Sequence, residues 1–237
     1  MKKIMLVFGT RPEAIKMCPL VCELRRRPDI SVCVCVTGQH REMLDEVLGV
    51  FGVKPDYDLA LMREGQSLFD ITTGVICGMK DVLAAEKPDV VLVHGDTTSA
   101  FAAALSAYYM KIPVGHVEAG LRTHNLYSPY PEEFNRNAVD IIAKYRFCPT
   151  EKSSENLAAE GISDGIYITG NTVIDALKTT VKKDFSHPLL EWAGKKRLVL
   201  ITAHRRESIG EPLEKRLRGI REAIEAHPDT RALYPVH

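Results

Sequence analysis

The sequence predicts an α/β protein with a doubly wound parallel sheet, followed by the start of a second Rossmann-like domain. Short apolar runs rich in β-branched residues alternate with segments of helical periodicity, which is the pattern of repeated βα units. Several of these runs are apolar on both faces, as in strands that helices cover on both sides. The chain of 237 residues is long enough for one such domain and part of another.

The strands are expected where an apolar run ends in a turn or a helical segment. They are Ile4–Phe8, Ser31–Thr37, Val90–His94, Val114–Glu118, Tyr145–Cys148, Ile166–Thr169, Leu198–Ala203 and Ala232–Val236. Because parallel strands all run in one direction, the carboxyl ends of the strands meet at the same edge of the sheet.

Helical patterns fill the intervals between these strands. Apolar stripes with spacings of three and four residues run over 14–21 and 43–51. Residues 67–88 predict a long helix that ends before a proline, and residues 97–110 predict a helix of small residues suited to close packing. A last helix is expected over residues 212–226.

A domain boundary is expected in the polar stretch 182–196, which contains a proline and a glycine. Residues 1–181 then form the first domain. Residues 197–237 form a single βαβ unit, which is too small to bury a core of its own.

The composition excludes several classes of protein. Lys plus Arg and Asp plus Glu both number 31, so no net charge attracts nucleic acid or an anionic membrane. No apolar run approaches the ~18–20 residues of a membrane span. The run Ile4–Phe8 is too short for a signal peptide, so a cytoplasmic location is expected. Cys18, Cys22, Cys33 and Cys35 have the spacing of buried hydrophobic side chains rather than of disulfides.

The turn after the first strand carries cations in place of the usual glycines. Thr10 and Glu13 have the spacing of a capping box, and Pro12 suits the first helical turn. The free N–H groups of this helix, together with Arg11 and Lys16, could bind a phosphate at the carboxyl edge of the sheet. The alternative is a well-capped surface helix whose cations are solvated.

Two acids follow two further strands. Asp96 comes directly after one strand and Glu118 ends the next, so both are expected to reach one crevice. Asp96 could instead cap the helix that follows it. His116 lies within a strand, and we expect it to be a hydrogen-bonded core residue.

A loop containing Pro and Tyr residues follows Gly120 and leads to Glu132 and Glu133 at the start of a helix. Long loops in compact domains are often functional, although acids at a helix N-terminus are also ordinary. If Asp96, Glu118 and Glu132 lie together, they should raise one another's pKa, as a general acid and base require.

A fourth segment places His204, Arg205 and Arg206 after a strand of the second domain. It is either a solvated surface loop or, if the domains face each other, a cationic loop directed at the ligand of Arg11 and Lys16. The sequence contains no GxxxxGK[ST], no GxGxxG after the first strand, no GxSxG and no metal-ligand spacing.

The motifs as a set resemble one known family. They are FGTRPEAIKM, TGQHREMLD, KPDVVLVHGDTT, IPVGHVEAGLRT, YSPYPEE, YITGNTVIDAL, AHRRES and YPVH, in this order along essentially the whole chain. They resemble the non-hydrolysing UDP-N-acetylglucosamine 2-epimerases of bacteria. The resemblance implies a GT-B architecture, with UDP-GlcNAc between two Rossmann-like domains. It also implies a homodimer that forms UDP-ManNAc through a 2-acetamidoglucal, without an added metal or nicotinamide cofactor.

The resemblance also implies roles for individual residues. It makes Asp96, Glu118 and Glu132 the acids of catalysis and puts His204 beside the diphosphate. Three cations would line the ligand cleft: Arg11, Lys16 and Arg205. Three residues match a second, regulatory UDP-GlcNAc site: Gln39, Gln66 and His237. Since family members continue beyond residue 237, where the uridine contacts lie, we expect little or no turnover from this chain alone.

Three other functions remain open at this point. A GT-B glycosyltransferase would share the fold and the UDP-sugar but would need an acceptor. A hydrolysing epimerase would release free ManNAc and UDP. A non-catalytic module would bind the nucleotide sugar or dimerise without turning it over.

Overall fold

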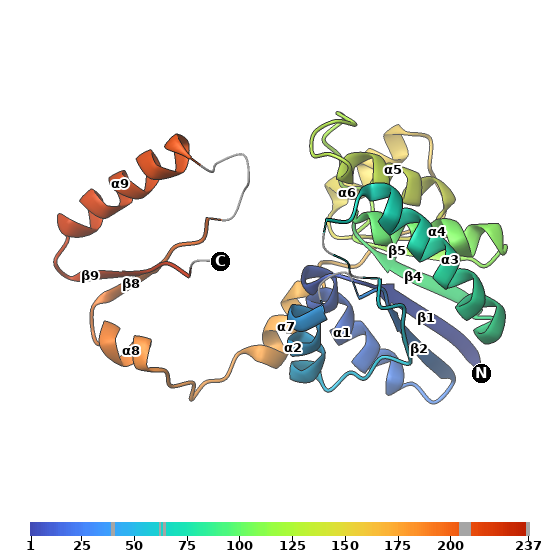
Figure 1. The fold of residues 1–237 in the computed structure, drawn as a ribbon, viewed down its shortest axis with the longest axis horizontal. Helices are drawn as coiled ribbons and strands as arrows, with labels where there is room; N and C mark the ends of the chain where they lie inside the picture. The colour runs from blue at the N-terminus through green and yellow to red at the C-terminus, as the bar shows by residue number, and fades with distance from the viewer. Residues whose placement is uncertain (39–40, 62, 64, 204–209, 236–237) are drawn as a thin grey trace. The chain divides into compact units, whose positions relative to one another are not determined.

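The computed structural model describes residues 1–38, 41–61, 63, 65–203 and 210–235. It divides the chain into two compact units, Met1–Thr180 and Val181–His237, which are treated separately below (Figure 1). Among the described residues, no helix combines the length and the apolar character needed to cross a lipid bilayer.

The first unit is built on a parallel sheet with the strand order β3-β2-β1-β4-β5-β6-β7. Its strands are β1 (Lys2–Phe8), β2 (Ile30–Val36), β3 (Tyr57–Asp58), β4 (Val90–His94), β5 (Val114–Val117), β6 (Tyr145–Cys148) and β7 (Ile166–Ile168). All pairs are parallel, so the doubly wound fold is confirmed. The order reverses between β1 and β4, which is where ligands bind in open α/β sheets. Among the strands that the structure describes in this unit, the two-residue strand β3 is the one that the sequence did not predict.

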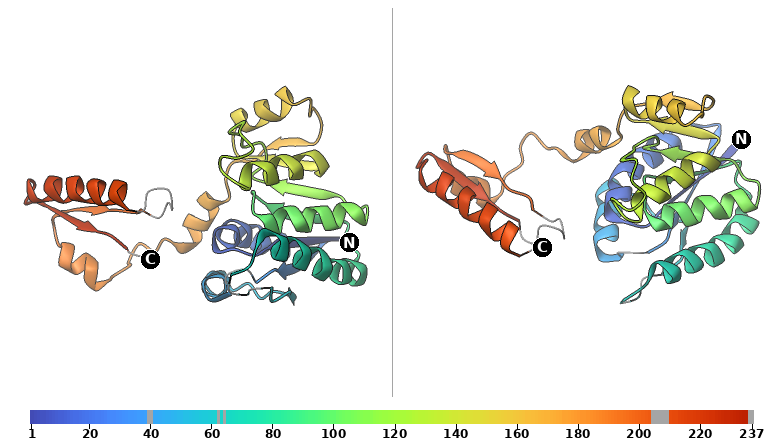
Figure 2. Two further views of the ribbon diagram at one scale, coloured as in Figure 1. Left: turned by 45° about the horizontal axis from the view of Figure 1, so that its top comes forward. Right: turned by 90° about the horizontal axis from the view of Figure 1, so that it is seen from above.

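Helices cover both faces of this sheet (Figure 2). They are α1 (Arg11–Arg25), α2 (Arg41–Phe51), α3 (Leu68–Glu86), α4 (Thr98–Tyr109), α5 (Glu132–Ile142), α6 (Glu151–Ala159) and α7 (Val173–Thr180). Helix α1 packs against α2 and α7, whereas α4 packs against α3 and α5. The helices predicted over the first 110 residues are therefore confirmed.

Alternate residues of each central strand enter different cores. Met5 and Val7 pack into the cluster that includes α3 and α4, whereas Leu6 and Phe8 pack into the cluster that includes α1 and α2. This is the consequence of side chains that alternate along a strand whose two faces are both covered. Three of the four cysteines expected in the interior are buried, and Cys22 is half-buried.

The predicted capping box at the start of α1 is confirmed, and it extends to a second helix. Glu13 is buried, and its Oε2 accepts the N–H groups of Gly9 at 2.9 Å and Thr10 at 2.7 Å. The Oε1 atom accepts the hydroxyl of Thr97, the N-cap of α4, at 2.7 Å. One carboxylate thus joins the N-termini of α1 and α4.

The second unit contains α8 (Pro188–Ala193), β8 (Arg197–Leu200), α9 (Glu211–Glu225) and β9 (Thr230–Leu233). The strands β8 and β9 form a parallel pair, and α9 lies between them in the chain. Both strands begin and end earlier than expected, and the stretch expected to be a linker contains α8. Among the described residues of this unit, Ala193 is the only buried hydrophobic side chain.

Candidate active site

The turn after β4 presents Asp96 between the strand and helix α4. Gly95 has φ +64°, which lets the chain turn sharply before the acid. The N-cap of α4 is Thr97, whose hydroxyl accepts the N–H of Ala100 at 3.0 Å, so the alternative that Asp96 caps this helix is wrong. The carboxylate of Asp96 instead forms an ion pair with Nη2 of Arg136 at 3.0 Å.

The turn after β5 holds Glu118 in an unusual backbone conformation. The strand ends at Val117, and Glu118 has φ +69°, a region that costs a non-glycine residue of order 1–3 kcal/mol. The amides of Glu118 and Ala119 both donate to the carbonyl of Phe147 at 3.1 Å, which helps to hold this conformation. At Gly120 a Cβ atom would lie 2.2 Å from the carbonyl oxygen of Ser153, so only glycine fits.

The carboxylate of Glu118 lies among three nitrogen-bearing side chains. Its Oε2 accepts hydrogen bonds from Nζ of Lys16 at 2.6 Å and Nδ2 of Asn171 at 2.8 Å. Nε2 of His94 lies 3.6 Å from the same oxygen, beyond hydrogen-bond distance. Burial alone would raise the pKa of Glu118, but His94 and Lys16 outweigh it and lower this pKa to about 2. Glu118 therefore stays ionised at neutral pH.

Asp96 has the opposite electrostatic environment. Burial raises its pKa, and the charges of Glu132 and Glu118 raise it further against the opposing charge of Arg136. The expectation that the acids raise one another's pKa is thus confirmed for Asp96. It is wrong for Glu118, because the nearby cations dominate there.

The two acids at the start of α5 have different environments. Glu132 is half-buried, and its charge acts on Asp96. Glu133 is fully buried and accepts the N–H groups of Thr123 and His124, each at 2.9 Å. Glu133 therefore orders the loop that precedes the helix, whereas Glu132 belongs to the electrostatic surroundings of Asp96.

His94 is a buried polar side chain that the fold itself does not satisfy. The residue is 4% exposed, and neither ring nitrogen has a hydrogen-bond partner among the described residues. Since an unpaired buried donor or acceptor costs free energy, such groups are rare outside functional sites. The imidazole faces the carboxylate of Glu118, whose pKa it helps to lower.

Reasoning from the sequence did not single out Asn171, Asn135 or Arg136. Asn135 donates from Nδ2 to the carbonyl of Asp96 at 2.9 Å, so it supports the same turn that Arg136 reaches. Asn171 follows β7, at the edge of the sheet where β4 and β5 also end. Its position after a strand end was the available signal.

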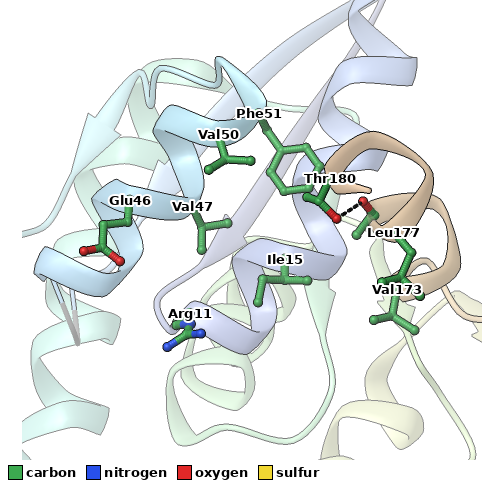
Figure 3. A pocket seen from close by; sticks show the side chains of 10 residues that line it. Arg11, Ile15, Glu46, Val47, Val50, Phe51, Val173, Leu177 and Thr180 are labelled. Carbon is green, nitrogen blue, oxygen red and sulfur yellow. Dashed lines mark hydrogen bonds between the residues drawn. The ribbon is translucent and has the colours of Figure 1, made fainter. Parts of the chain in front are cut away.

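Arg11 lies apart from these contacts. In the described part of the chain its Nη1 is 4.0 Å from Sδ of Met43, and its side chain lines a groove of about 340 Å³. Figure 3 shows Arg11 and Glu46 near one end of this groove and apolar side chains of α1, α2 and α7 along the rest. Of the two cations predicted from the first turn, only Lys16 contacts one of the three acids among the described residues.

The remaining predicted residues are mostly beyond what the structure describes. His204, Arg205, Gln39 and His237 all lie outside the described residues. Gln66 is described: its Nε2 donates to the carbonyl of Leu61, and it lines a cavity of about 330 Å³. The grouping of Gln66 with the other two residues of a regulatory site stays a prediction.

Comparisons with known proteins identify the family. The family model described as UDP-N-acetylglucosamine 2-epimerase matches residues 22–237. The UDP-N-acetylglucosamine 2-epimerase of Bacillus subtilis is 52% identical over 236 residues, which are 99% of this chain and 62% of that protein. The chain therefore spans less than two thirds of the length of this relative.

Solved structures agree with the sequence comparison. A Listeria monocytogenes structure, provisionally named for the same activity, has a TM-score of 0.95 and 54% identity, covering 100% of this chain and 62% of its own. The Neisseria meningitidis UDP-GlcNAc 2-epimerase, solved with bound UDP-GlcNAc, has a TM-score of 0.90 and 49% identity, covering 99% of this chain and 66% of its own. These neighbours are of the GT-B type. The chain belongs to the UDP-N-acetylglucosamine 2-epimerase family, the one that its ordered motifs resemble.

Proposed function

We propose that this protein interconverts UDP-N-acetylglucosamine and UDP-N-acetylmannosamine by elimination and re-addition of UDP. The observation that carries the proposal is the pairing of Asp96, whose pKa is raised, with an ionised Glu118 bound to Lys16. The family membership and the UDP-GlcNAc bound to the Neisseria meningitidis relative support the choice of substrate.

The chemistry requires the leaving group to depart early. The hydrogen at C2 of the sugar is not adjacent to a carbonyl, so a carboxylate cannot remove it easily from the intact substrate. Cleavage of the bond between C1 and the diphosphate oxygen leaves positive charge at C1, which acidifies C2–H. Loss of that proton gives 2-acetamidoglucal and UDP. Protonation of C2 on the opposite face and return of the UDP oxygen to C1 complete the epimerisation.

Each acid has an environment that suits a different part of this reaction. Asp96 is the base in this proposal, because a raised pKa brings a carboxylate closer to the operating pH and its side chain is 32% exposed. Glu118 remains charged and stabilises the cationic character at C1. Glu132, half-buried at the start of α5, supplies the proton on the opposite face. Lys16 has two roles in this proposal: its ammonium keeps Glu118 ionised, and it also stabilises the departing diphosphate.

We further propose that the second unit begins the UDP-binding domain and that residues 182–196 connect the two domains. The parallel βαβ unit formed by β8, α9 and β9 supports this, since such units begin nucleotide-binding domains. The apolar side chains that this unit leaves exposed, including Leu200 at 65%, are consistent with an incomplete core. We also propose a cytoplasmic location, because the apolar run Ile4–Phe8 is too short for a signal peptide.

The decisive experiment follows deuterium at C2. The complete native protein that contains this sequence is incubated with UDP-GlcNAc in D₂O without any acceptor, and C2 deuteration is followed by NMR. The Asp96→Asn variant should lose about 10²- to 10⁴-fold of the exchange rate, the usual contribution of a general base. Asp175→Asn is the matched control, because Asp175 is an exposed acid that pairs with Lys178 on α7.

The outcomes separate the competing functions. Exchange at the normal rate in Asp96→Asn would reject the role of this residue as base. Release of free ManNAc would indicate a hydrolysing enzyme. Binding of UDP without exchange in the parent protein would indicate a non-catalytic module. A glycosyltransferase would leave C2 protonated throughout.

A further inference from the structure

A buried network beneath the two acidic turns contains residues that the proposed reaction does not use. His116 on β5 and Asp140 on α5 both have no exposed surface. Nδ1 of His116 lies 2.6 Å from Oδ1 of Asp140, and Nε2 lies 2.7 Å from the carbonyl oxygen of Gly95. Gly95 directly precedes Asp96, so this chain of contacts ends at the turn that carries the proposed base.

The second oxygen of Asp140 reaches the neighbouring turn. Oδ2 accepts the N–H of Gly120 at 3.1 Å and Nη1 of Arg122 at 2.8 Å. Gly120 is two residues after Glu118 and begins the loop toward α5. A single carboxylate therefore contacts the Glu118 turn directly and the Asp96 turn through one imidazole.

The hydrogen-bond partners and nearby charges determine which atoms of this network act as donors and which act as acceptors. The carbonyl of Gly95 can only accept, so Nε2 of His116 carries a hydrogen. Burial alone would raise the pKa of Asp140, but His116 and Arg122 outweigh it and lower this pKa. The carboxylate is therefore ionised, and it contacts one side of the His116 ring while the carbonyl of Gly95 contacts the other. The charge of Arg122 is balanced in turn by Glu160, with an Nε to Oε1 distance of 2.6 Å.

The turn that carries Glu118 needs such support because Glu118 is a non-glycine residue in a left-handed conformation, whereas glycines occupy the other left-handed positions. Gly95 has φ +64°, Glu118 has φ +69° and Gly120 has φ +79°. Conformations of this kind persist at non-glycine residues only where surrounding contacts maintain them. The bonds that the carboxylate of Asp140 makes to Gly120 and His116 are buried, and a charged acceptor makes such bonds stronger than neutral ones.

We propose that Asp140 is a positioning residue that sets the separation of Asp96 and Glu118, directly through Gly120 and indirectly through His116. The proposal deepens the proposed function and rests on it for the roles of the two acids. The competing interpretation is that the network only stabilises the fold, in which case its loss would leave the geometry of the acids unchanged in the molecules that fold.

The test compares two variants of the same charged cluster in the complete native protein. Asp140→Asn removes the charge that holds both turns. Glu160→Gln is the matched control, because Glu160 binds Arg122 through both of its oxygens but contacts neither turn in the described structure. Asp140→Asn should lower kcat about 10²-fold with little change in KM, the effect expected when a reacting group moves by about 1 Å. Glu160→Gln should change kcat by less than about twofold, as expected for an ion pair at the edge of the cluster.

NMR gives a readout that does not depend on turnover. Asp140→Asn should shift the amide resonances of Gly95, Asp96 and Gly120, whereas Glu160→Gln should leave them unchanged. His116→Gln serves as the second variant if Asp140→Asn does not fold, and it should lower kcat and shift the resonances of Gly95 and Asp96.

The outcomes distinguish the two proposals. Equal losses of kcat in Asp140→Asn and Glu160→Gln, or unshifted amide resonances in Asp140→Asn, would overturn the positioning role. If the parent shows no epimerisation, the proposed function fails, while the amide shifts still decide whether Asp140 controls both turns.

Discussion

The turns after β4 and β5 both carry a carboxylate, and the two strands are direct neighbours in the sheet. The turn after β4 gives Asp96 one cationic partner, Arg136, and its pKa is raised mainly by burial. The turn after β5 brings Glu118 close to Lys16, Asn171 and His94, and its pKa is lowered to about 2.

This difference shows that topology and charge state have separate origins. The parallel sheet determines that both acids lie at one edge. The protonation of each acid depends on side chains from other parts of the chain. Lys16 is 102 positions from Glu118 in sequence, and Asn171 is 53 positions away. One sheet edge can thus hold an ionised carboxylate beside one that accepts a proton more readily.

The largest effect on stability is expected from removing the cation of the Glu118 turn. Lys16→Met leaves a carboxylate that is only 15% exposed without its shortest partner. The free energy of unfolding should fall by about 3 kcal/mol, at the lower end for a broken buried pair because both side chains keep some solvent contact. Urea denaturation followed by circular dichroism measures the change.

Lys178→Met is the control for this substitution. Lys178 pairs with Asp175 on the surface of α7, and both side chains are more than half exposed. Its loss should change the free energy of unfolding by less than about 0.5 kcal/mol. Equal effects of the two substitutions would mean that the Lys16–Glu118 pair behaves as a surface pair, and the contrast between the turns would disappear.

An intermediate effect on the free energy of unfolding is expected from lowering the pH. The pKa of Glu118 falls from its ordinary value of 4.5 to about 2 on folding, so its ionised form stabilises the folded state above about pH 4.5. This contribution, about 2 kcal/mol after allowance for partial exposure, is lost as the pH falls toward 2. The parent protein should therefore exceed Glu118→Gln in stability at neutral pH, and the difference should shrink on acidification. A difference that is independent of pH would contradict the lowered pKa.

The smallest effect on the free energy of unfolding is expected from substituting Asp96, and here the substitution should stabilise the protein rather than destabilise it. Because its pKa is raised in the folded state, its ionised form opposes folding at neutral pH, and this cost disappears when the carboxyl is protonated in both states. Asp96→Asn should therefore leave the free energy of unfolding unchanged or raise it slightly at neutral pH, and this gain should disappear as the pH falls below the ordinary pKa of aspartate. A clear loss of stability in urea denaturation at neutral pH would show that Asp96 is held as firmly as Glu118.

Most of the fold could be predicted because its signals are local. The strands of the first unit are short apolar runs, and the capping box of Thr10 and Glu13 lies within four residues. The expectation that His116 is a hydrogen-bonded core residue is also confirmed. The strand Tyr57–Asp58 was missed because two residues cannot display an alternating pattern.

The positions of the two acids of the candidate site could be predicted from the sequence, but the side chains that bind them could not. Asp96 and Glu118 follow neighbouring strands, as expected from the parallel topology. Lys16, however, was expected to hold an anionic ligand, and its bond to Glu118 depends on how α1 packs across the sheet. Arg136 and Asn171 were missed for the same reason, since their partners are distant in sequence and only the packed fold brings them together.

The bonds of Glu13 to Gly9, Thr10 and Thr97 have a consequence for ligand binding. They connect the first helix, which carries Lys16, to the first turn of the helix that follows Asp96. The two helices cannot slide past each other without breaking contacts to a buried carboxylate. A ligand that arrives at this edge would thus meet a ready-made spacing between the ammonium of Lys16 and the proposed base Asp96, and little of its affinity would be spent on arranging them.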